Sequence, residues 1–383
     1  MDKPTVQDIF HRFYPAYLDQ YSPSPVQAKV AHNIMNCKTG AYGANVCVCE
    51  DCGFVQIHYN SCRNRCCPMC QAVPKEMWMD ARREDVLDAP YFHLVFTVPD
   101  ILNPVIYSNQ SLLYDALYHA ASSTISELTA DPKHLGAKVG YICILHTWGS
   151  EMNFHPHIHT ILLGGGLASN NQWKDNGENF FLPIRVISKM FRGKYLEELK
   201  RLWEEDKLVF HGTAEKFRNH YTFKELLDSC YGMDWIPHCK KTFNGAQTVI
   251  KYLGKYTHRI AVSNHRIVRM DDDTVTFLVK DYRNEGQWKE LTISGVEFVR
   301  RFLMHVPPRR FVRIRHYGLL CSRTKSQKLT LCRNLLGCKK YLSKLRDMEM
   351  PEILEHLYGI KVCVCKACGG HLGKPQMRMP LRC

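Results

Sequence analysis

Three histidines occupy alternate positions at the start of an apolar stretch, in the order His155-Pro-His157-Ile-His159. In a β-strand, alternate residues point to the same face, so these imidazoles would converge on one side of a sheet. Imidazole nitrogens bind several divalent metals. The pattern therefore predicts a metal site with His157 and His159 as ligands, without selecting the metal. Surface histidines or hydrogen-bonded core histidines are the alternative interpretation of this motif alone.

A second candidate group lies in the segment YLGKYTHR, where Tyr252, Lys255, Tyr256 and Arg259 recur at spacings of three and four. The segment from Ala246 is predicted to be a helix, and such spacings place side chains on one helical face. A phenol oxygen can attack a phosphodiester while neighbouring cations balance the developing charge. An amphipathic helix that packs two tyrosines is the alternative, but its phenols would not usually alternate with cations.

The chain contains 18 cysteines, and eight of them lie between residues 37 and 70. Structural zinc takes four thiolate or imidazole ligands, which two Cys-x2-Cys pairs can supply. We expect a first zinc ion at Cys49, Cys52, Cys67 and Cys70. The nearby residues that would suffice for a second metal are Cys37, Cys47, Cys62, Cys66 and His32.

A smaller cysteine cluster follows near residue 365. Cys363, Cys365 and Cys368, together with His371, form another candidate zinc site, for which the sequence offers no obvious fourth ligand. The isolated cysteines, which we expect to be small core residues, are Cys143, Cys230 and Cys239.

The composition is that of a globular protein of two or three domains, with 383 residues, 45% hydrophobic and 23% charged. No apolar run approaches the roughly 18 to 20 residues that span a bilayer. The opening MDKPTVQDIF lacks an apolar signal core, which argues against secretion. We therefore expect a cytoplasmic protein, whose clustered cysteines bind metal rather than form disulfides.

The net charge of +14 is concentrated in one segment. Residues 298–346 contain 14 Lys and Arg and no acidic residue, while the rest of the chain has 37 basic and 37 acidic residues. A solvated face is the alternative, but an uncompensated basic segment favours a polyanionic partner. The candidate contacts with such a partner are Arg259, Arg309, Arg310, Arg313 and Arg315.

The hydrophobic pattern predicts alternating strands and helices. Expected strands are residues 91–99, 141–148, 155–166, 275–282 and 289–298, and expected helices are 77–90, 111–130, 194–205 and 246–260. We expect an N-terminal zinc-binding domain (1–88), a central domain (89–299) that carries the histidine and tyrosine motifs, and a basic C-terminal region (300–383).

Three motifs in this order, FHLVFTVP, HPHIH and YLGKYTHR, resemble those of the HUH single-strand endonucleases. The closer resemblance is to the two-tyrosine transposases of rolling-circle insertion sequences, of the insertion-sequence-91 type, and covers nearly the whole chain. YNSCRNRCCPMCQ (59–71) is similar to the zinc-binding segment of that family, which usually has His where this chain has Cys66. LHTWGSEMNFHPHIH, KYLGKYTHRIAVSN, VTFLVKDY and RIRHYGLL also resemble the family pattern.

The resemblance implies an α+β fold, with a central antiparallel sheet of the RRM-like or ferredoxin-like kind flanked by helices. It implies Tyr252 and Tyr256 as nucleophiles assisted by Lys255, structural zinc, and catalytic Mg²⁺ or Mn²⁺ held by His157 and His159. The family's third metal ligand has no evident counterpart, and His155 is the nearest candidate.

The function implied is that of a transposase that nicks and rejoins single-stranded DNA and binds element-end hairpins, without a membrane or nucleotide cofactor. The chain has no GxxxxGK[ST] loop, and a phosphotyrosine linkage conserves the bond energy without ATP. A rolling-circle replication initiator would use the same nuclease chemistry. A non-enzymatic zinc-finger DNA-binding protein is the weaker alternative.

Overall fold

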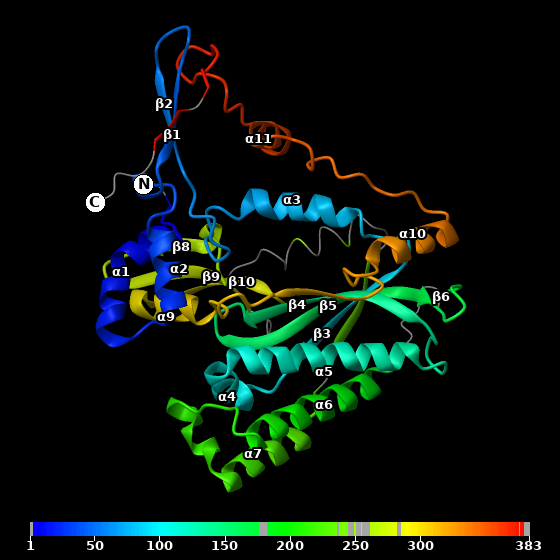
Figure 1. Ribbon diagram of the computed structural model, residues 1–383. Coiled ribbons are helices and arrows are strands. Elements are labelled where there is room, and N and C mark those ends of the chain that lie inside the picture. Colours follow the sequence, from blue (N-terminus) through cyan, green and yellow to red (C-terminus); the bar gives the residue numbers. More distant parts are fainter. Residues whose placement is uncertain are drawn as a thin grey trace.

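The computed structural model of the chain describes residues 3–175, 182–235, 237–243, 249, 254, 261–281, 285–374 and 376–378. In these ranges the strands form three antiparallel sheets, and helices pack around them (Figure 1). The expected α+β fold class is confirmed. None of the helices in the described ranges has the length and apolar character needed to cross a lipid bilayer.

The largest sheet has six strands. They are β3 (Tyr91–Thr97), β4 (Lys138–Trp148), β5 (Phe154–Leu167), β6 (Trp173–Asp175), β7 (His238–Phe243) and β11 (Ile314–Gly318). Their order is β11-β4-β5-β3-β7, and β6 pairs with β5. The long strands β4 and β5 are almost wholly buried, because other elements cover both of their faces. Away from the histidines, their sequences are therefore largely apolar rather than alternating in polarity.

Helices cover one face of this central sheet (Figure 1). They are α4 (Asn103–Ser108), α5 (Gln110–Ala130), α6 (Ile184–Glu204) and α7 (His220–Gly232). The main hydrophobic core lies here, where Phe92 and Phe96 of β3 pack with Tyr118 of α5 and Phe191 of α6. Helix α5 ends at Ala130, and Asp131 is extended because the proline that follows it disfavours a helical conformation there.

The opposite face of the central sheet is apolar at one end and carries histidines at the other. Alternation along β4 places Ile142, Ile144 and His146 on this face. The apolar end packs against Met79 and other residues of α3 (Ala72–Arg83) and α10 (Lys325–Leu336). The sheet therefore presents imidazoles at the edge of an apolar layer.

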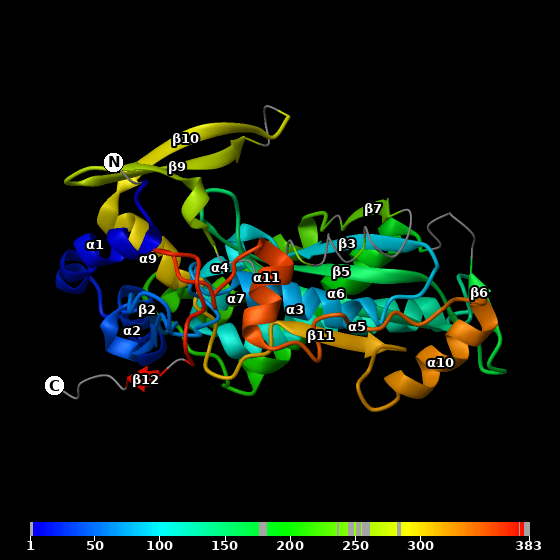
Figure 2. The ribbon, with the colours of Figure 1, turned by 90° about the horizontal axis from the view of Figure 1, so that it is seen from above.

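A second unit combines three helices with a separate three-stranded sheet (Figure 2). Its elements are α1 (Val6–Gln20), α2 (Pro25–Met35), β8 (Ile267–Met270), β9 (Thr274–Asp281), β10 (Gln287–Ser294) and α9 (Gly295–Met304). Phe10, Phe277 and Phe302 lie in its core, and Trp148 and Met152 join the same cluster. The unit therefore packs directly against the connection between β4 and β5.

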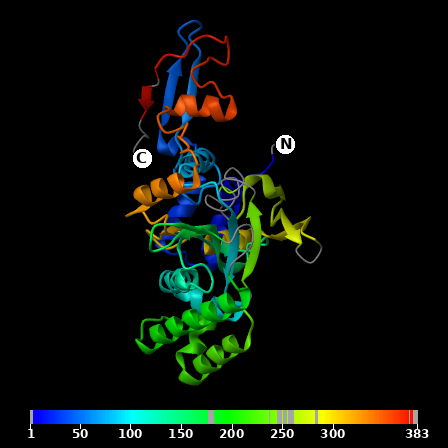
Figure 3. The ribbon, with the colours of Figure 1, turned by 90° about the vertical axis from the view of Figure 1, so that its right-hand side faces the viewer.

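A third sheet projects from the body of the molecule (Figure 3). It consists of the hairpin β1 (Ala44–Val48) and β2 (Val55–Tyr59), with β12 (Gln376–Arg378) paired to β1. Helix α11 (Met350–Tyr358) precedes this returning segment. The N-terminal hairpin and the C-terminal segment therefore fold together.

Most of the predicted elements are confirmed. The strands expected at residues 91–99, 141–148, 155–166 and 275–282 are β3, β4, β5 and β9. The expected strand 289–298 is wrong in its second half. Strand β10 ends at Ser294. The Ser294 hydroxyl accepts a hydrogen bond from the Glu297 amide at 3.2 Å and caps the N-terminus of α9.

Other boundaries also differ from those expected. The helix expected at 77–90 is α3, which begins at Ala72 and ends at Arg83. The expected helix 246–260 lies outside the described residues except for Val249 and Gly254, which are helical. Strand β11 lies in the expected C-terminal region 300–383, but it pairs with β4 at the edge of the central sheet. The division into three domains stays a prediction.

Candidate metal and DNA-cleavage site

Three imidazoles from two adjacent strands converge on one face of the central sheet. Strand β4 supplies His146, and β5 supplies His157 and His159, with His146 opposite His157 in the antiparallel pairing. Their ring nitrogens lie within 4.8 Å of one another, and the Nε2 atoms of His157 and His159 are 3.0 Å apart. The structure thus brings both predicted ligands together and adds His146, which sequence reasoning missed.

The orientation of His157 suits a metal ligand. Its Nδ1 lies 2.7 Å from the carbonyl oxygen of His155. Because a carbonyl only accepts, Nδ1 carries the proton and Nε2 presents its lone pair to the cluster. Burial lowers the pKa of His157 to about 4, so the ring is neutral at pH 7, which is the form that binds metals.

Neighbouring side chains hold the other two imidazoles. Nε2 of His93 on β3 lies 2.9 Å from Nδ1 of His159. The indole of Trp148 stacks on His146, with ring centroids 4.7 Å apart. Hydrogen bonds and packing of this kind orient metal-binding histidines.

His155, the nearest third-ligand candidate from the sequence, is not part of this cluster in the described residues. Its Nδ1 lies 3.2 Å from a carboxylate oxygen of Asp100. The side chain is partly exposed at the rim of the same cavity. His146 therefore occupies the position for which His155 was considered.

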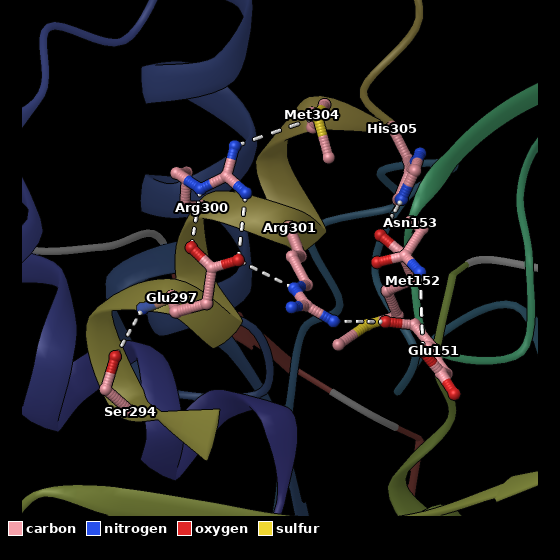
Figure 4. Close-up of polar contacts among 9 residues, drawn as sticks. All are labelled: Glu151, Met152, Asn153, Ser294, Glu297, Arg300, Arg301, Met304 and His305. Carbon is pink, nitrogen blue, oxygen red and sulfur yellow. Dashed lines mark hydrogen bonds and ion pairs between the residues drawn. The ribbon is translucent and has the colours of Figure 1, made fainter. Parts of the chain in front are cut away.

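The turn between β4 and β5 is fastened to α9 (Figure 4). Arg301 donates to the carbonyl of Glu151 at 2.9 Å, and Nε2 of His305 lies 2.9 Å from the carbonyl oxygen of Met152. Glu297 accepts hydrogen bonds from Arg301 and from its neighbour Arg300. These contacts fix the turn whose two strands carry the histidine cluster.

The histidines line a cavity of about 350 Å³. Lys280 of β9 and Trp288 of β10 contribute to its wall. The Lys280 Nζ lies 5.3 Å from the centroid of the Trp288 ring, and 52% of Trp288 is exposed. The cavity therefore combines candidate metal ligands, a cation and an accessible aromatic ring.

The predicted nucleophiles Tyr252 and Tyr256, with Lys255 and Arg259, lie outside the described residues. Two described residues belong to the same segment. Val249 is buried in the apolar cluster that also contains Met79 of α3. A Cβ on Gly254 would meet the Met79 side chain, so the backbone at this position approaches α3 closely. This cluster lies on the face of the central sheet that carries the histidines.

A first group of cysteines gathers at the base of the hairpin. Its members, whose sulfurs lie within 4.8 Å of one another, are Cys37, Cys62, Cys67 and Cys70. The Cys62 and Cys70 sulfurs are 3.8 Å apart. Sulfurs bound to one tetrahedral zinc at about 2.3 Å have about this separation. Hydrogen bonds from the Cys62 and Cys67 thiols lower the pKa of Cys70, which favours the thiolate.

The other Cys-x2-Cys pair of the N-terminal module lies elsewhere. Cys49 and Cys52 occupy the turn of the β1–β2 hairpin and meet Cys365 and Cys368. The five-residue strands separate this turn from the first cluster by roughly 17 Å. The spacing predicted one zinc site made of Cys49, Cys52, Cys67 and Cys70. This prediction is wrong, because the structure places the two pairs in separate clusters.

Several other candidate ligands stand outside both clusters. Cys66 is buried beside Arg313, and burial raises its pKa. His371 pairs with Glu50 at 3.6 Å, and the exposed Cys363 is in neither group of described sulfurs. Cys66 therefore does not belong to the cluster of Cys37, Cys62, Cys67 and Cys70, although it precedes Cys67 directly in the sequence.

Acids from outside the basic segment neutralise part of its charge. The ion pairs are Arg300 and Arg301 with Glu297, Arg315 with Asp115, Lys325 with Asp85, and Arg346 with Glu84. The Arg313 guanidinium packs 5.6 Å from the Trp148 ring centroid. Arg309 and Arg310 are exposed and form no ion pair within the described part of the chain. Of the four arginines predicted in this segment, these two are therefore free to meet a partner.

Two family matches cover most of these features. Residues 9–98 match the family described as "Transposase zinc-binding domain", and residues 140–328 match "Putative transposase". The first range contains the Cys37 cluster, and the second contains the three histidines.

Two curated relatives match along most of their length. "Putative transposase y4qJ" of Sinorhizobium fredii is 40% identical over 95% of this chain and 93% of its own. "Transposase for insertion sequence element IS801" of Pseudomonas savastanoi pv. phaseolicola is 30% identical over 79% of this chain and 72% of its own. Among solved structures, the conjugative relaxase TrwC in complex with oriT DNA has a TM-score of 0.26, at 13% identity over 67% of this chain and 96% of that one.

Proposed function

We propose that this chain, which belongs to the insertion-sequence-91 type of transposases with an N-terminal zinc-binding domain, cuts and rejoins single-stranded DNA through 5′-phosphotyrosine intermediates. As a member of that family, it is a transposase of the rolling-circle type. The observation that supports the chemical proposal is the convergence of His146, His157 and His159 in the wall of one cavity.

We assign the three imidazoles to a catalytic divalent cation. The site fits a cation, because all three rings are buried and the Nε2 lone pair of His157 faces the other two rings. Nitrogen donors suit transition metals better than Mg²⁺, so of the two expected ions we favour Mn²⁺. When bound, the ion would polarise a phosphodiester oxygen and stabilise the charge that develops there.

Tyr252 and Tyr256 are the proposed nucleophiles. The phenol oxygen bonds to phosphorus, the bond from phosphorus to the 3′ oxygen breaks, and the 5′ phosphate stays on the tyrosine. The phenol loses its proton to solvent and the released 3′ oxygen takes one up. Lys255 balances charge on the phosphate. Two tyrosines allow a second cleavage while the first 5′ end is still covalently held.

The surroundings of the histidines supply contacts for the DNA strand. A base can stack on the exposed Trp288 ring, while Lys280 faces the phosphates. Arg259, Arg309 and Arg310 are the proposed phosphate contacts. We do not assign Arg313 and Arg315 to phosphate contacts. Arg313 packs on the Trp148 ring and Arg315 forms an ion pair with Asp115, so we propose that both stabilise the surrounding structure.

The proposed partners are single-stranded DNA and hairpins at the element ends, with no nucleotide cofactor. The N-terminal domain is a zinc-binding domain, and we assign its structural ion to Cys37, Cys62, Cys67 and Cys70. The site of action would be the bacterial cytoplasm, where the DNA is accessible.

A covalent-adduct assay tests the chemistry. Purified protein is incubated with Mn²⁺ and labelled single-stranded DNA from an element end, and denaturing gels reveal any protein–DNA adduct. Tyr252→Phe or Tyr256→Phe alone should still form adduct but lose strand transfer, and the double variant should form none. Tyr221→Phe, on the exposed surface of α7, is the matched control. Adduct in the double variant would show that the nucleophile lies elsewhere.

A further inference from the structure

The second sulfur cluster joins segments that lie more than 300 residues apart in the chain. The Cys49 and Cys368 sulfurs are 3.5 Å apart, and those of Cys52 and Cys365 are 3.7 Å apart. Sulfurs at the corners of a tetrahedron around zinc, each about 2.3 Å from the ion, are about 3.8 Å apart. A disulfide would hold two sulfurs at about 2.05 Å. The spacing of the four thiols therefore fits a shared metal ion.

The two cysteine pairs have the same local form. Each Cys-x2-Cys is followed by a glycine in the left-handed region, Gly53 with φ +69° and Gly369 with φ +78°. The amide of each glycine donates to the carbonyl of the first cysteine of its pair, at 3.0 and 2.9 Å. The amides of Ala367 and Gly370 donate to the sulfurs of their own pair at 3.4 Å. Such amides stabilise thiolates, which are the metal-binding form.

Backbone hydrogen bonds hold the two segments together around the sulfurs. The Glu50 amide donates to the His371 carbonyl at 3.1 Å, and the Gly373 amide donates to the Val48 carbonyl at 2.9 Å. Leu372 is buried among the cysteines of both segments. Figure 3 shows the C-terminal segment running beside the projecting hairpin. The cluster is therefore the centre of one small folded unit.

We propose that Cys49, Cys52, Cys365 and Cys368 bind a second structural zinc ion, which fastens the C-terminal segment to the N-terminal hairpin. This ion is separate from the one in the Cys37 cluster. Few apolar side chains are buried here, so metal binding supplies much of the folding free energy of the unit. Cross-linking positions so distant in sequence also restricts the unfolded chain.

The C-terminal stretch is attached to the rest of the chain at two places, and the first of them is helix α3. Asp80 on this helix accepts hydrogen bonds from Tyr341 at 2.6 Å and from Ser343 at 2.5 Å. The zinc site then anchors the same C-terminal stretch a second time, beyond α11. The basic segment is thereby held against the body of the molecule at its C-terminal end.

Zinc content gives the first measurement. Dialysed wild-type protein should contain two zinc ions per chain, and Cys365→Ser with Cys368→Ser should contain one. Cys363→Ser is the matched control, because Cys363 is only two residues from Cys365 but outside the cluster, and it should keep both ions. A wild-type content of one zinc, or an unchanged content in the double variant, would overturn the proposal.

The second measurement keeps all the cysteines, so it does not depend on the folding of a variant. A protease recognition sequence replaces residues 359–361, which lie between α11 and the cysteine pair. After cleavage, the C-terminal fragment should remain bound to the rest of the chain during gel filtration and should be released by a zinc chelator. Release while zinc is present, or retention after zinc has been removed, would contradict the proposed role of the ion.

Discussion

His146 on β4 lies directly opposite His157 on β5, so the two strands of one hairpin present imidazoles to the same point. A β-bulge between His146 and Trp148 shifts the pairing by one residue relative to Trp148 and Phe154, and this shift places His146 opposite His157. His159 completes the group because it lies two residues beyond His157 on the same face. The third ligand of the cluster thus depends on a bulge, and a regular hairpin register counted from the turn would not have placed His146 opposite His157.

Replacing His146 with alanine should abolish most metal-dependent DNA cleavage. Loss of hydrogen-bond partners behind a ligand costs about 10- to 100-fold in metal affinity or activity, so loss of a ligand should cost at least about 100-fold. Adduct formation is measured against Mn²⁺ concentration. His155→Ala is the matched control and should retain most activity, since Asp100 holds that ring away from the cluster. Equal losses in both variants would contradict the assignment of His146.

His93→Phe should weaken metal binding without removing a ligand. The change deletes the contact between His93 Nε2 and His159 Nδ1, which orients the His159 ring. We expect about 10- to 100-fold weaker Mn²⁺ binding, with cleavage largely restored at saturating metal. Calorimetric titration with Mn²⁺ measures the affinity directly. An unchanged affinity would mean that His159 is oriented by other contacts.

Local patterns predicted the parts of this fold that depend on local sequence. The apolar strand 91–97, the helix that ends before Pro132 and the alternating histidines all belong to single segments. The predicted grouping of Cys49 and Cys52 with Cys67 and Cys70 was wrong because the true partners lie in a distant segment. Cys52 meets Cys365, 313 residues away, and spacing within one segment carries no information about such a contact.

Trp288→Ala should weaken the binding of single-stranded DNA. Stacking of a base on an aromatic ring contributes about 1–3 kcal/mol, so we expect roughly 5- to 150-fold weaker binding. Trp288→Phe should retain part of the affinity, because the smaller ring still offers a flat surface. Tyr221→Ala is the matched control, since Tyr221 is also exposed but lies on α7, behind the opposite face of the sheet. Fluorescence anisotropy with a labelled oligonucleotide distinguishes these outcomes.

Arg309→Gln with Arg310→Gln should reduce the salt dependence of DNA binding. Removing one phosphate contact lowers the slope of log K against log salt by about 0.7 for a single strand. Affinity should fall similarly for all sequences, because phosphate contacts do not read bases. Lys200→Gln with Lys207→Gln removes the same charge from exposed positions at and just beyond the end of α6 and should leave the slope unchanged. If the two pairs behave alike, the effect is one of net charge alone.

The buried His305 should make the stability of the protein fall with acid. Burial lowers its pKa from 6.5 to about 4, and Arg300 nearby acts in the same direction. Well above pH 6.5 the ring is neutral in both the folded and the unfolded chain, so its contribution is constant. Between pH 6.5 and 4 the unfolded chain binds the proton more readily, so the free energy of unfolding falls as pH falls.

The full shift corresponds to about 3 kcal/mol for this one residue. His305→Gln keeps a donor toward the Met152 carbonyl but cannot be protonated, so its unfolding free energy should fall less steeply over the same range. Urea unfolding at a series of pH values measures the slopes. The exposed His119 provides the control, and His119→Gln should follow the wild-type curve. The pKa values of the buried His157 and the half-buried His316 are lowered over the same range, so His305→Gln should reduce the acid sensitivity without removing it. A His305→Gln slope equal to that of the wild type would mean that burial does not lower the pKa of His305.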